Sequence, residues 1–260
     1  RINVSAKRMC MPEVPEELFM DAIHQLVQLD SAWVPQNKGC SLYIRPFIFA
    51  SEELLGVRPP EEYKFMIITS PVCSYYTGAV DVKIETHYTR AAEGGVGFAK
   101  AAGNYAAALY PAKLGQEKGF KQLIWTDAKN HEYIEESGTM NVMFLIDNKI
   151  ITPSISLNTT LAGITRDSVL KLAQEMGVEV EERRVAVKEI VEAARNNRLQ
   201  DAFGTGTAAT IAQIASITYE DEKFELPALE NRVVSNQIAE TIDAIKRGNI
   251  EDKYGWIYKI

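Results

Sequence analysis

Apolar residues recur with helical spacing in the first part of the chain, and denser apolar runs follow. Over residues 15–29 they stand three and four positions apart, which predicts an amphipathic helix. Residues 1–9 also read as helix, with no capping residue ahead of them. Ser41–Phe49 and Tyr63–Thr69 are rich in β-forming residues, and prolines bound the second run. The pattern predicts an α+β arrangement for this part.

A break in the pattern predicts a second, larger α+β domain. Turn formers and small residues fill Ser70–Gly78, which we interpret as a linker. Strands are predicted beyond it at Val80–Glu85, Leu123–Thr126 and Val142–Ile146. Helices are predicted at Asn104–Leu114, Arg166–Met176, Lys188–Asn196 and Asn231–Lys246, with Thr165 as the cap of the second. We therefore expect a small domain over residues 1–72, an interdomain loop over 73–79 and a large domain over 80–260.

Composition narrows the classes of function. With 260 residues, 46% of them hydrophobic, the chain can bury the cores of two domains. A net charge of -7 argues against a nucleic acid or an anionic membrane as the main partner. No apolar run approaches the roughly 20 residues that span a bilayer, and no charged-then-apolar leader opens the chain. We expect small-molecule chemistry without a nucleic-acid or membrane partner.

The cysteines and histidines give no sign of a cross-linked or metal-bound framework. Cys10, Cys40 and Cys73 are far apart and form no CxxC pair, so we expect neither disulfides nor a thiolate metal site. The three histidines are equally scattered, which argues against a histidine metal cluster. The expectation is a cytoplasmic protein with no metal.

Lys100 follows a glycine-rich run and precedes a predicted helix. The glycines of Gly94–Gly97 allow close approach of backbone or ligand, and small residues flank the lysine. A lysine after such a run is usually an ordinary surface residue. A buried one would have a lowered pKa and could form an imine with an aldehyde.

Three further segments concentrate glycine, hydroxyl or acidic residues beside apolar elements. Gly163–Arg166 opens a helix, where amides and a hydroxyl can hold phosphate or merely cap. Phe203–Ala209 has the residues of a turn or of a second phosphate contact. Glu135 and Glu136, taken alone, are typical of solvent-exposed acidic residues before a strand. A dinucleotide loop is disfavoured because the glycines lack GxGxxG spacing. Taken with Lys100, these are the components of a pyridoxal-phosphate site.

These segments resemble the branched-chain aminotransferases, which are fold type IV pyridoxal-phosphate enzymes. The likeness covers nearly the whole chain and rests on motifs in matching order: 41–46, 94–105, 136–141, 163–166 and 204–208. It implies an α+β two-domain architecture like that of D-amino acid aminotransferase. It also implies transfer of the amino group of L-leucine, L-isoleucine or L-valine to 2-oxoglutarate, in a ping-pong mechanism between the pyridoxal and pyridoxamine forms of the cofactor.

The resemblance assigns cofactor roles to particular positions. Lys100 would hold the cofactor aldehyde as an imine and then move the proton between substrate and cofactor. Glu136, favoured over Glu135 by the motif that follows it, would face the pyridine nitrogen. Tyr105 would donate to the phenolic oxygen. The remaining implied cofactor contacts, most of them around the phosphate, are Arg1, Thr139, Ile164, Thr165 and Thr207.

The resemblance also assigns substrate and partner contacts. Backbone amides of Thr207 and Ala208 would hold the substrate carboxylate, and Tyr43 with Arg45 would bind the distal carboxylate of glutamate or 2-oxoglutarate. Tyr75 would close over the substrate. Leu55 and Val57 match positions that reach into a neighbouring subunit's site, which implies a homodimer or a larger oligomer of this chain.

Two departures from the family and three alternatives accompany this interpretation. The redox CxxC of some mitochondrial relatives falls at Ala209–Ala212 and is absent. The family's N-terminal strands have no counterpart before Arg1, so we expect the sequence to begin inside a longer protein, with only the C-terminal part of the small domain. A D-amino acid aminotransferase or an aminodeoxychorismate lyase would share the lysine, the glutamate and the phosphate-binding residues. Tyr43, Arg45 and the 204–208 turn favour branched-chain substrates. A non-catalytic binding subunit is the third alternative.

Overall fold

The computed structural model describes residues 1–37, 39–73 and 78–260. They form two compact units, Arg1–Tyr75 with Tyr258–Ile260, and Tyr76–Ile257. The division falls within the segment that we interpreted as a linker, and the assignment of the first unit as part of a small domain remains a prediction.

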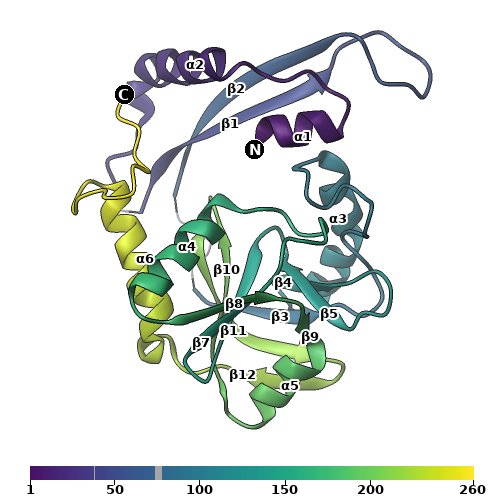
Figure 1. Ribbon diagram of the computed structural model, residues 1–260, viewed down its shortest axis with the longest axis vertical. Helices are drawn as coiled ribbons and strands as arrows, with labels where there is room; N and C mark the ends of the chain where they lie inside the picture. Colours follow the sequence, from purple (N-terminus) through teal and green to yellow (C-terminus); the bar gives the residue numbers. More distant parts are fainter. Residues whose placement is uncertain (38, 74–77) are drawn as a thin grey trace. The chain divides into compact units, whose positions relative to one another are not determined.

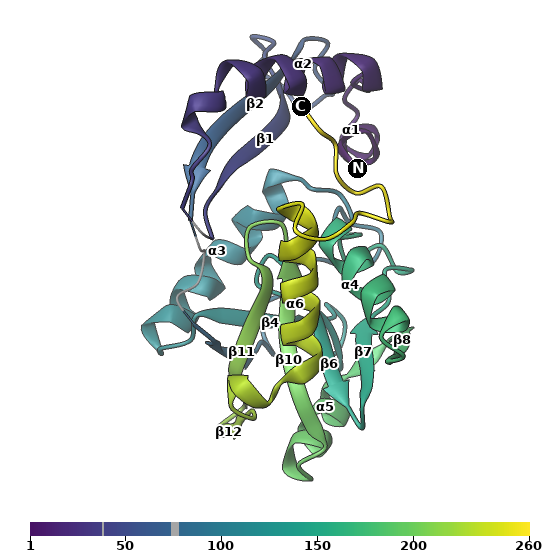
Figure 2. The ribbon, with the colours of Figure 1, turned by 90° about the vertical axis from the view of Figure 1, so that its left-hand side faces the viewer.

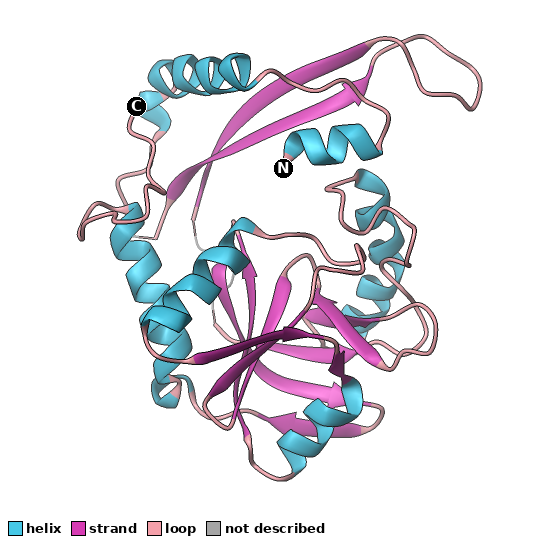
Figure 3. Ribbon diagram, viewed as in Figure 1, coloured by secondary structure: helices cyan, strands magenta, loops and turns pink. Residues whose placement is uncertain are grey.

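A long antiparallel hairpin with helices forms the first unit (Figure 3). Its strands pair in unbroken register from Ser41 opposite Val72 to Ala50 opposite Tyr63. Stacking of Phe19 on Phe65, with ring centroids 6.0 Å apart, packs a helix against the second strand. The elements of this unit are α1 (Ile2–Arg8), α2 (Glu16–Leu29), a 3-10 turn (Ser31–Trp33), β1 (Ser41–Ala50) and β2 (Tyr63–Val72).

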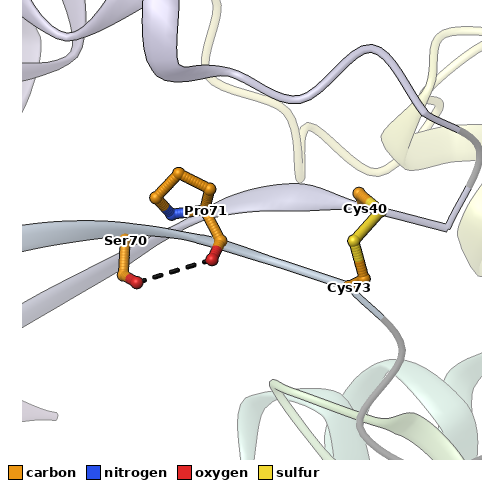
Figure 4. Close-up of a disulfide and its surroundings, with 4 residues drawn as sticks. All are labelled: Cys40, Ser70, Pro71 and Cys73. Atoms are coloured by element: carbon orange, nitrogen blue, oxygen red, sulfur yellow. Dashed lines mark hydrogen bonds between the residues drawn. A yellow bond between two sulfur atoms is a disulfide. The ribbon is translucent and has the colours of Figure 1, made fainter.

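A disulfide between Cys40 and Cys73 closes the open end of this hairpin (Figure 4). The prediction of no disulfide is therefore wrong. The two residues are 33 positions apart, but they flank the terminal pair of Ser41 and Val72 and so lie directly across the hairpin. Distance along the sequence was a poor guide because antiparallel pairing brings remote positions together. Cys10 is a free, exposed cysteine.

A ten-stranded mixed sheet lies at the centre of the second unit in the described part of the chain. The strand order is β8-β7-β6-β10-β11-β3-β4-β5-β9, with β12 paired to β11. The strands are β3 (Val80–Ile84), β4 (Gln122–Thr126), β5 (Tyr133–Ser137), β6 (Asn141–Ile146), β7 (Lys149–Pro153), β8 (Glu179–Arg183), β9 (Val185–Ala186), β10 (Leu199–Gly206), β11 (Thr210–Tyr219) and β12 (Glu222–Glu225).

Two apolar clusters lie on opposite faces of the sheet around β6. Met143 and Leu145 point into one cluster with helices α4 (Ile164–Glu175) and α6 (Val233–Lys246), whereas Val142 and Phe144 point into the other with helix α5 (Val187–Arg195). The strand is buried on both faces for this reason. Figure 2 shows α6 lying along β10 and β11. The helices of this unit are α3 (Ala102–Glu117), α4 (Ile164–Glu175), α5 (Val187–Arg195), a 3-10 turn (Leu229–Asn231) and α6 (Val233–Lys246).

The helices and strands that we predicted are present, with ends shifted by a few residues (Figure 1). Thr165 as a cap was wrong, because α4 begins at Ile164 and Gly163 occupies the capping position. Strand β2 continues through Pro71, which the hairpin tolerates opposite Leu42. Several strands were missed, among them β5 and β10. No helix among the described residues is long and apolar enough to cross a membrane.

Candidate active site

Lys100 lies at a pocket of the second unit, in the loop that precedes α3. The pocket is lined by residues of the glycine loop, of α3, of the end of β5 and of a later loop: Arg90, Gly97, Ala99, Lys100, Asn104, Tyr105, Ala108, Glu136, Gly138, Thr139 and Leu161. The structure thus brings together Lys100, Tyr105, Glu136 and Thr139, which the sequence assigned to one cofactor.

Asn104 and Gly97 fix the loop that carries Lys100. The buried Asn104 donates through Nδ2 to the carbonyl oxygens of Val96, at 2.9 Å, and Ala99, at 2.8 Å. A Cβ on Gly97 would lie 2.4 Å from the Thr159 carbonyl oxygen, so only glycine fits this approach. The side chain of Lys100 is exposed rather than buried, and its Nζ donates to the Tyr105 hydroxyl at 3.1 Å.

Glu135 and Glu136 lie on β5 and are buried, with 5% and 3% of their surface exposed. This burial contradicts the solvated acids that the pair would suggest when taken alone, because β5 is an internal strand of the sheet between β4 and β9. Glu136 Oε1 accepts a hydrogen bond of 2.6 Å from the Leu161 amide. Burial raises the pKa of Glu136 to about 7, opposed by the positive charge of Arg90 and by the Leu161 amide.

Burial likewise raises the pKa of Glu135 to about 7. A hydrogen bond from Thr159 and the charge of Arg90 oppose this rise, while Asp127 and Glu93 add to it. Its Oε2 has no hydrogen-bond partner among the residues that the structure describes. Both carboxyl groups are buried and feel the charge of Arg90, but of the two only Glu136 lines the pocket.

Arg90 is a pocket residue that the sequence did not reveal. Its Nε lies 3.3 Å from Glu136 Oε2, and its Nη2 donates to the carbonyl oxygens of Gly97 and Thr159. Only 9% of the residue is exposed. Its sequence neighbours, Thr89 and Ala91, form no spacing pattern that would have marked it. Its position follows only from the fold, which brings residues 69 apart into contact.

The start of α4 has the properties expected of a phosphate seat. No side-chain hydrogen bond caps this helix within the described chain, Ile164 is exposed and Thr165 is half-buried. Asn141 donates through Nδ2 to the Leu161 carbonyl at 2.8 Å and so holds the loop that enters the helix. Arg166 is turned away, since its Nη2 donates to Glu182 at 2.6 Å and to the Pro153 carbonyl at 3.1 Å.

The turn at Thr207 and Ala208 joins β10 to β11, and both residues are exposed. Its base is held by Lys246, whose Nζ donates to Thr210 Oγ1 at 2.7 Å. Strand β10 runs beside β6 with Thr205 opposite Asn141. The register therefore links the turn, through Asn141, to the loop before α4.

The other candidate residues belong to the first unit. Arg1 is exposed at the start of α1, and Arg45 Nη2 donates to the Tyr43 hydroxyl at 3.5 Å. Leu55 and Val57 stand fully exposed, at 102% and 108%. Tyr75 lies outside the described residues. Among the described residues no group of three or more histidine, cysteine, aspartate or glutamate side chains is arranged to hold a metal.

Comparison with known proteins identifies the class to which this fold and pocket belong. The family model "Amino-transferase class IV" matches residues 1–217. The chain therefore belongs to the class IV aminotransferases, and its fold is fold type IV.

Among curated proteins, the chain is similar to branched-chain-amino-acid aminotransferase 2 of Bacillus subtilis. The two are 41% identical over 263 residues, which is 100% of this chain and 72% of that protein. Among solved structures, it is similar to the branched-chain amino acid aminotransferase from Escherichia coli, with 28% identity, a TM-score of 0.79, and coverage of 98% and 79% of the two chains. The branched-chain amino acid aminotransferase from Thermobaculum terrenum, solved in its PLP form, shows the same fold, with a TM-score of 0.74, 23% identity, and coverage of 93% and 75%.

Proposed function

We propose that this chain is a pyridoxal-phosphate aminotransferase that moves the amino group of L-leucine, L-isoleucine or L-valine to 2-oxoglutarate. The observation that carries the proposal is the placement of Lys100, with its Nζ 3.1 Å from the Tyr105 hydroxyl, in the same pocket as the buried carboxyl of Glu136. The 41% identical relative is named for branched-chain amino acids, which supports this substrate class.

The pocket residues fit pyridoxal phosphate. An exposed lysine amine at the pocket can reach an aldehyde, a phenol beside it can donate to the neighbouring phenolic oxygen, and a buried carboxyl can pair with a ring nitrogen. An uncapped helix start, that of α4, is joined to the same pocket through Leu161. Bound there, the cofactor supplies an aldehyde that takes the amino group and a ring that accepts electrons from the substrate carbon.

Lys100, oriented by Tyr105, carries out the proton transfer in this proposal. Lys100 Nζ would move the proton from the substrate α-carbon to the cofactor carbon that receives the amino group, and would carry a proton the opposite way when 2-oxoglutarate takes that amino group; the nearby Tyr105 hydroxyl would orient Nζ. Glu136 would hold a proton on the ring nitrogen, because its carboxyl group lines the pocket. Thr139, exposed at the pocket edge, would contact the cofactor.

The phosphate is expected on the amides of Ile164 and Thr165 and on the Thr207 hydroxyl, with Arg1 as its counter-charge. The amides at a helix start converge on an anion, and α4 leaves them free of a side-chain cap in the described chain. The substrate carboxylate is expected on the Thr207 and Ala208 amides, which the exposed turn presents. Tyr43, Arg45 and Tyr75 complete the substrate site in this proposal.

The active assembly is proposed to be a homodimer located in the cytoplasm. Leu55 and Val57 expose large apolar side chains close together in a loop, as interface residues would in a separated chain. The expectation of a reducing compartment rested on unpaired cysteines, and the Cys40–Cys73 disulfide no longer supports it. Cell fractionation tests the proposed location.

The test uses the native protein with added pyridoxal phosphate. We expect an absorption band that shifts with L-leucine and 2-oxoglutarate, and a borohydride-reduced adduct that peptide mass spectrometry locates on Lys100. A colourless protein without an adduct would instead identify a non-catalytic binding subunit. Half-reaction rates with L-leucine, D-alanine and aminodeoxychorismate separate the remaining alternatives, because activity confined to either of the last two would contradict the proposal.

A further inference from the structure

Arg90 connects the carboxylate of Glu136 to both loops beside the pocket. We propose that Arg90 is a positioning residue that keeps Glu136 ionised and aimed at the cofactor ring nitrogen. The inference rests on the proposed function, because it concerns the ring of the pyridoxal phosphate expected there.

The geometry makes Arg90 a permanent buried cation behind the carboxylate. Its Nε is 3.3 Å from Glu136 Oε2, and 7% and 4% of the two side chains are exposed. Guanidinium does not lose its proton in proteins, so this charge persists at every working pH. When one partner of a buried ion pair is removed, the other is left as an uncompensated charge and tends to neutralise.

The pKa of Glu136 lies close to neutral pH, so the charge of one neighbour can decide whether the carboxyl group is ionised. Burial and the neighbouring Glu135 raise the pKa of Glu136, while Arg90, the Leu161 amide and Lys100 lower it, and the result is about 7. Without Arg90 the balance moves toward the neutral acid, since Arg90 is the largest of the opposing influences. A neutral carboxyl cannot pair with a protonated pyridine, so the ring would lose its proton and draw fewer electrons from the substrate.

The same guanidinium also sets the direction of the carboxylate. Its Nη2 donates to the carbonyl oxygens of Gly97 and Thr159, which belong to the lysine loop and to the loop before α4. Two residues after Thr159, the Leu161 amide donates to the other oxygen of Glu136. Arg90 therefore fixes the carboxylate directly and fixes its second donor through the loop. A lysine could replace the charge but not this planar fork of donors.

Arg232 offers a matched control elsewhere in the same unit. It is 3% exposed, its Nη1 lies 3.3 Å from Asp201 Oδ1, and it donates to the Pro227 and Ile214 carbonyl oxygens. Arg90 and Arg232 thus have similar burial and similar partners, but Arg232 does not line the pocket. A purely structural role predicts the same consequences for the loss of either.

The experiment follows the ring nitrogen of bound, ¹⁵N-labelled pyridoxal phosphate by NMR as a function of pH. It compares the native protein with Arg90→Met, Arg90→Gln, Arg90→Lys, Glu136→Gln and Arg232→Met. In both neutral Arg90 variants we expect the ring to lose its proton at a pH lower by about one unit or more, and kcat to fall roughly 10- to 100-fold. Arg90→Lys should restore most of the ring proton. Glu136→Gln should remove it, and adding Arg90→Met to Glu136→Gln should lower kcat little further.

Arg232→Met should lower the melting temperature as Arg90→Met does, yet leave the ring nitrogen signal at its native pH dependence. The inference is overturned if a neutral Arg90 variant keeps the native pH dependence of the ring signal, or if Arg232→Met shifts it equally. Arg90→Gln keeps the test open should Arg90→Met fail to fold, because its amide can still donate to one carbonyl. Failure of the native protein itself to bind the cofactor at Lys100 would overturn the proposed function instead.

Discussion

The surroundings of Glu136 in the pocket and of Leu55 and Val57 in their loop differ in burial and in the contacts that this chain provides. Glu136 is 3% exposed and has a cation and an amide as partners within its own unit. Leu55 and Val57 are fully exposed. Burying an apolar side chain of this size is worth about 1.5–3 kcal/mol, so covering these two by another molecule, as the proposed homodimer would do, would be favourable.

The difference separates two kinds of functional residue. Groups that hold a charged, reactive ring must be placed before the ligand arrives, and the fold of a single unit can do this. Groups that shape an apolar substrate pocket can come from elsewhere, including a second copy. We therefore expect chemistry to depend most on the second unit and substrate affinity to depend on the first.

The largest effect is expected from Lys100→Ala, which removes both the tether and the base. Transamination of L-leucine should fall by more than about 10³-fold, since general base catalysis alone contributes roughly 10² to 10⁴. Absorbance of bound cofactor and steady-state rates measure the loss. Lys113→Ala, at a lysine further along α3 and outside the pocket lining, is the control and should stay within about twofold. A Lys100→Ala protein that still turns over leucine would contradict the assignment.

Glu136→Gln should have the next largest effect, roughly a 10²-fold loss of kcat, because an amide cannot pair with a protonated ring nitrogen. The KM for leucine should change little, since the carboxyl does not face the substrate side chain in this proposal. Rates measured across a range of leucine concentrations separate the two constants. A loss confined to KM would show that Glu136 does not act through the ring.

Replacing Leu55 and Val57 together by serine should weaken self-association and raise the KM for leucine about tenfold, with kcat nearly unchanged. Sedimentation velocity and steady-state kinetics measure the two effects. Leu29→Ser provides a comparison, because Leu29 is 81% exposed in the same unit but lies on α2. Equal effects of both replacements would mean that the loop has no special part in assembly.

The smallest effect on activity is expected from Glu135→Gln, whose main consequence is a change in stability with pH. Burial raises the pKa of Glu135 to about 7, above the value of 4.5 for an unperturbed carboxyl. The folded protein therefore binds more protons than the unfolded chain between these two values, and the contribution of Glu135 to stability falls as pH rises through this window. At pH 8 the amide should stabilise the cofactor-free protein by on the order of 1 kcal/mol, and at about pH 4 it should not.

Chemical denaturation of native protein and variant at both pH values tests this prediction. An amide that stabilises the protein equally under the two conditions would show that ionisation of Glu135 is not the cause. Rates with leucine should stay within about threefold of native, because Glu135 does not line the pocket.

The sequence predicted the helices and the first strands because their apolar spacing is local. The resemblance to the branched-chain aminotransferases also assigned Lys100, Tyr105, Glu136 and Thr139 to one site, and the pocket brings these residues together. The sequence did not reveal Arg90, the burial of Glu135 and Glu136, or the Cys40–Cys73 bond. Each of these depends on which strands and loops become neighbours, and spacing along a single sequence holds little information about that.

The contacts that complete the pocket also imply an order of folding. The bond from Arg90 to Thr159 spans 69 residues and that from Leu161 to Glu136 spans 25, whereas Asn104 reaches only 8 residues back to Val96. Closing a long loop costs more entropy than closing a short one. The loop that carries Lys100 can therefore form early, whereas the contacts around Glu136 form only after the strands of the sheet have paired. We expect amide hydrogen exchange during refolding to show protection of α3 before protection of the Leu161 amide.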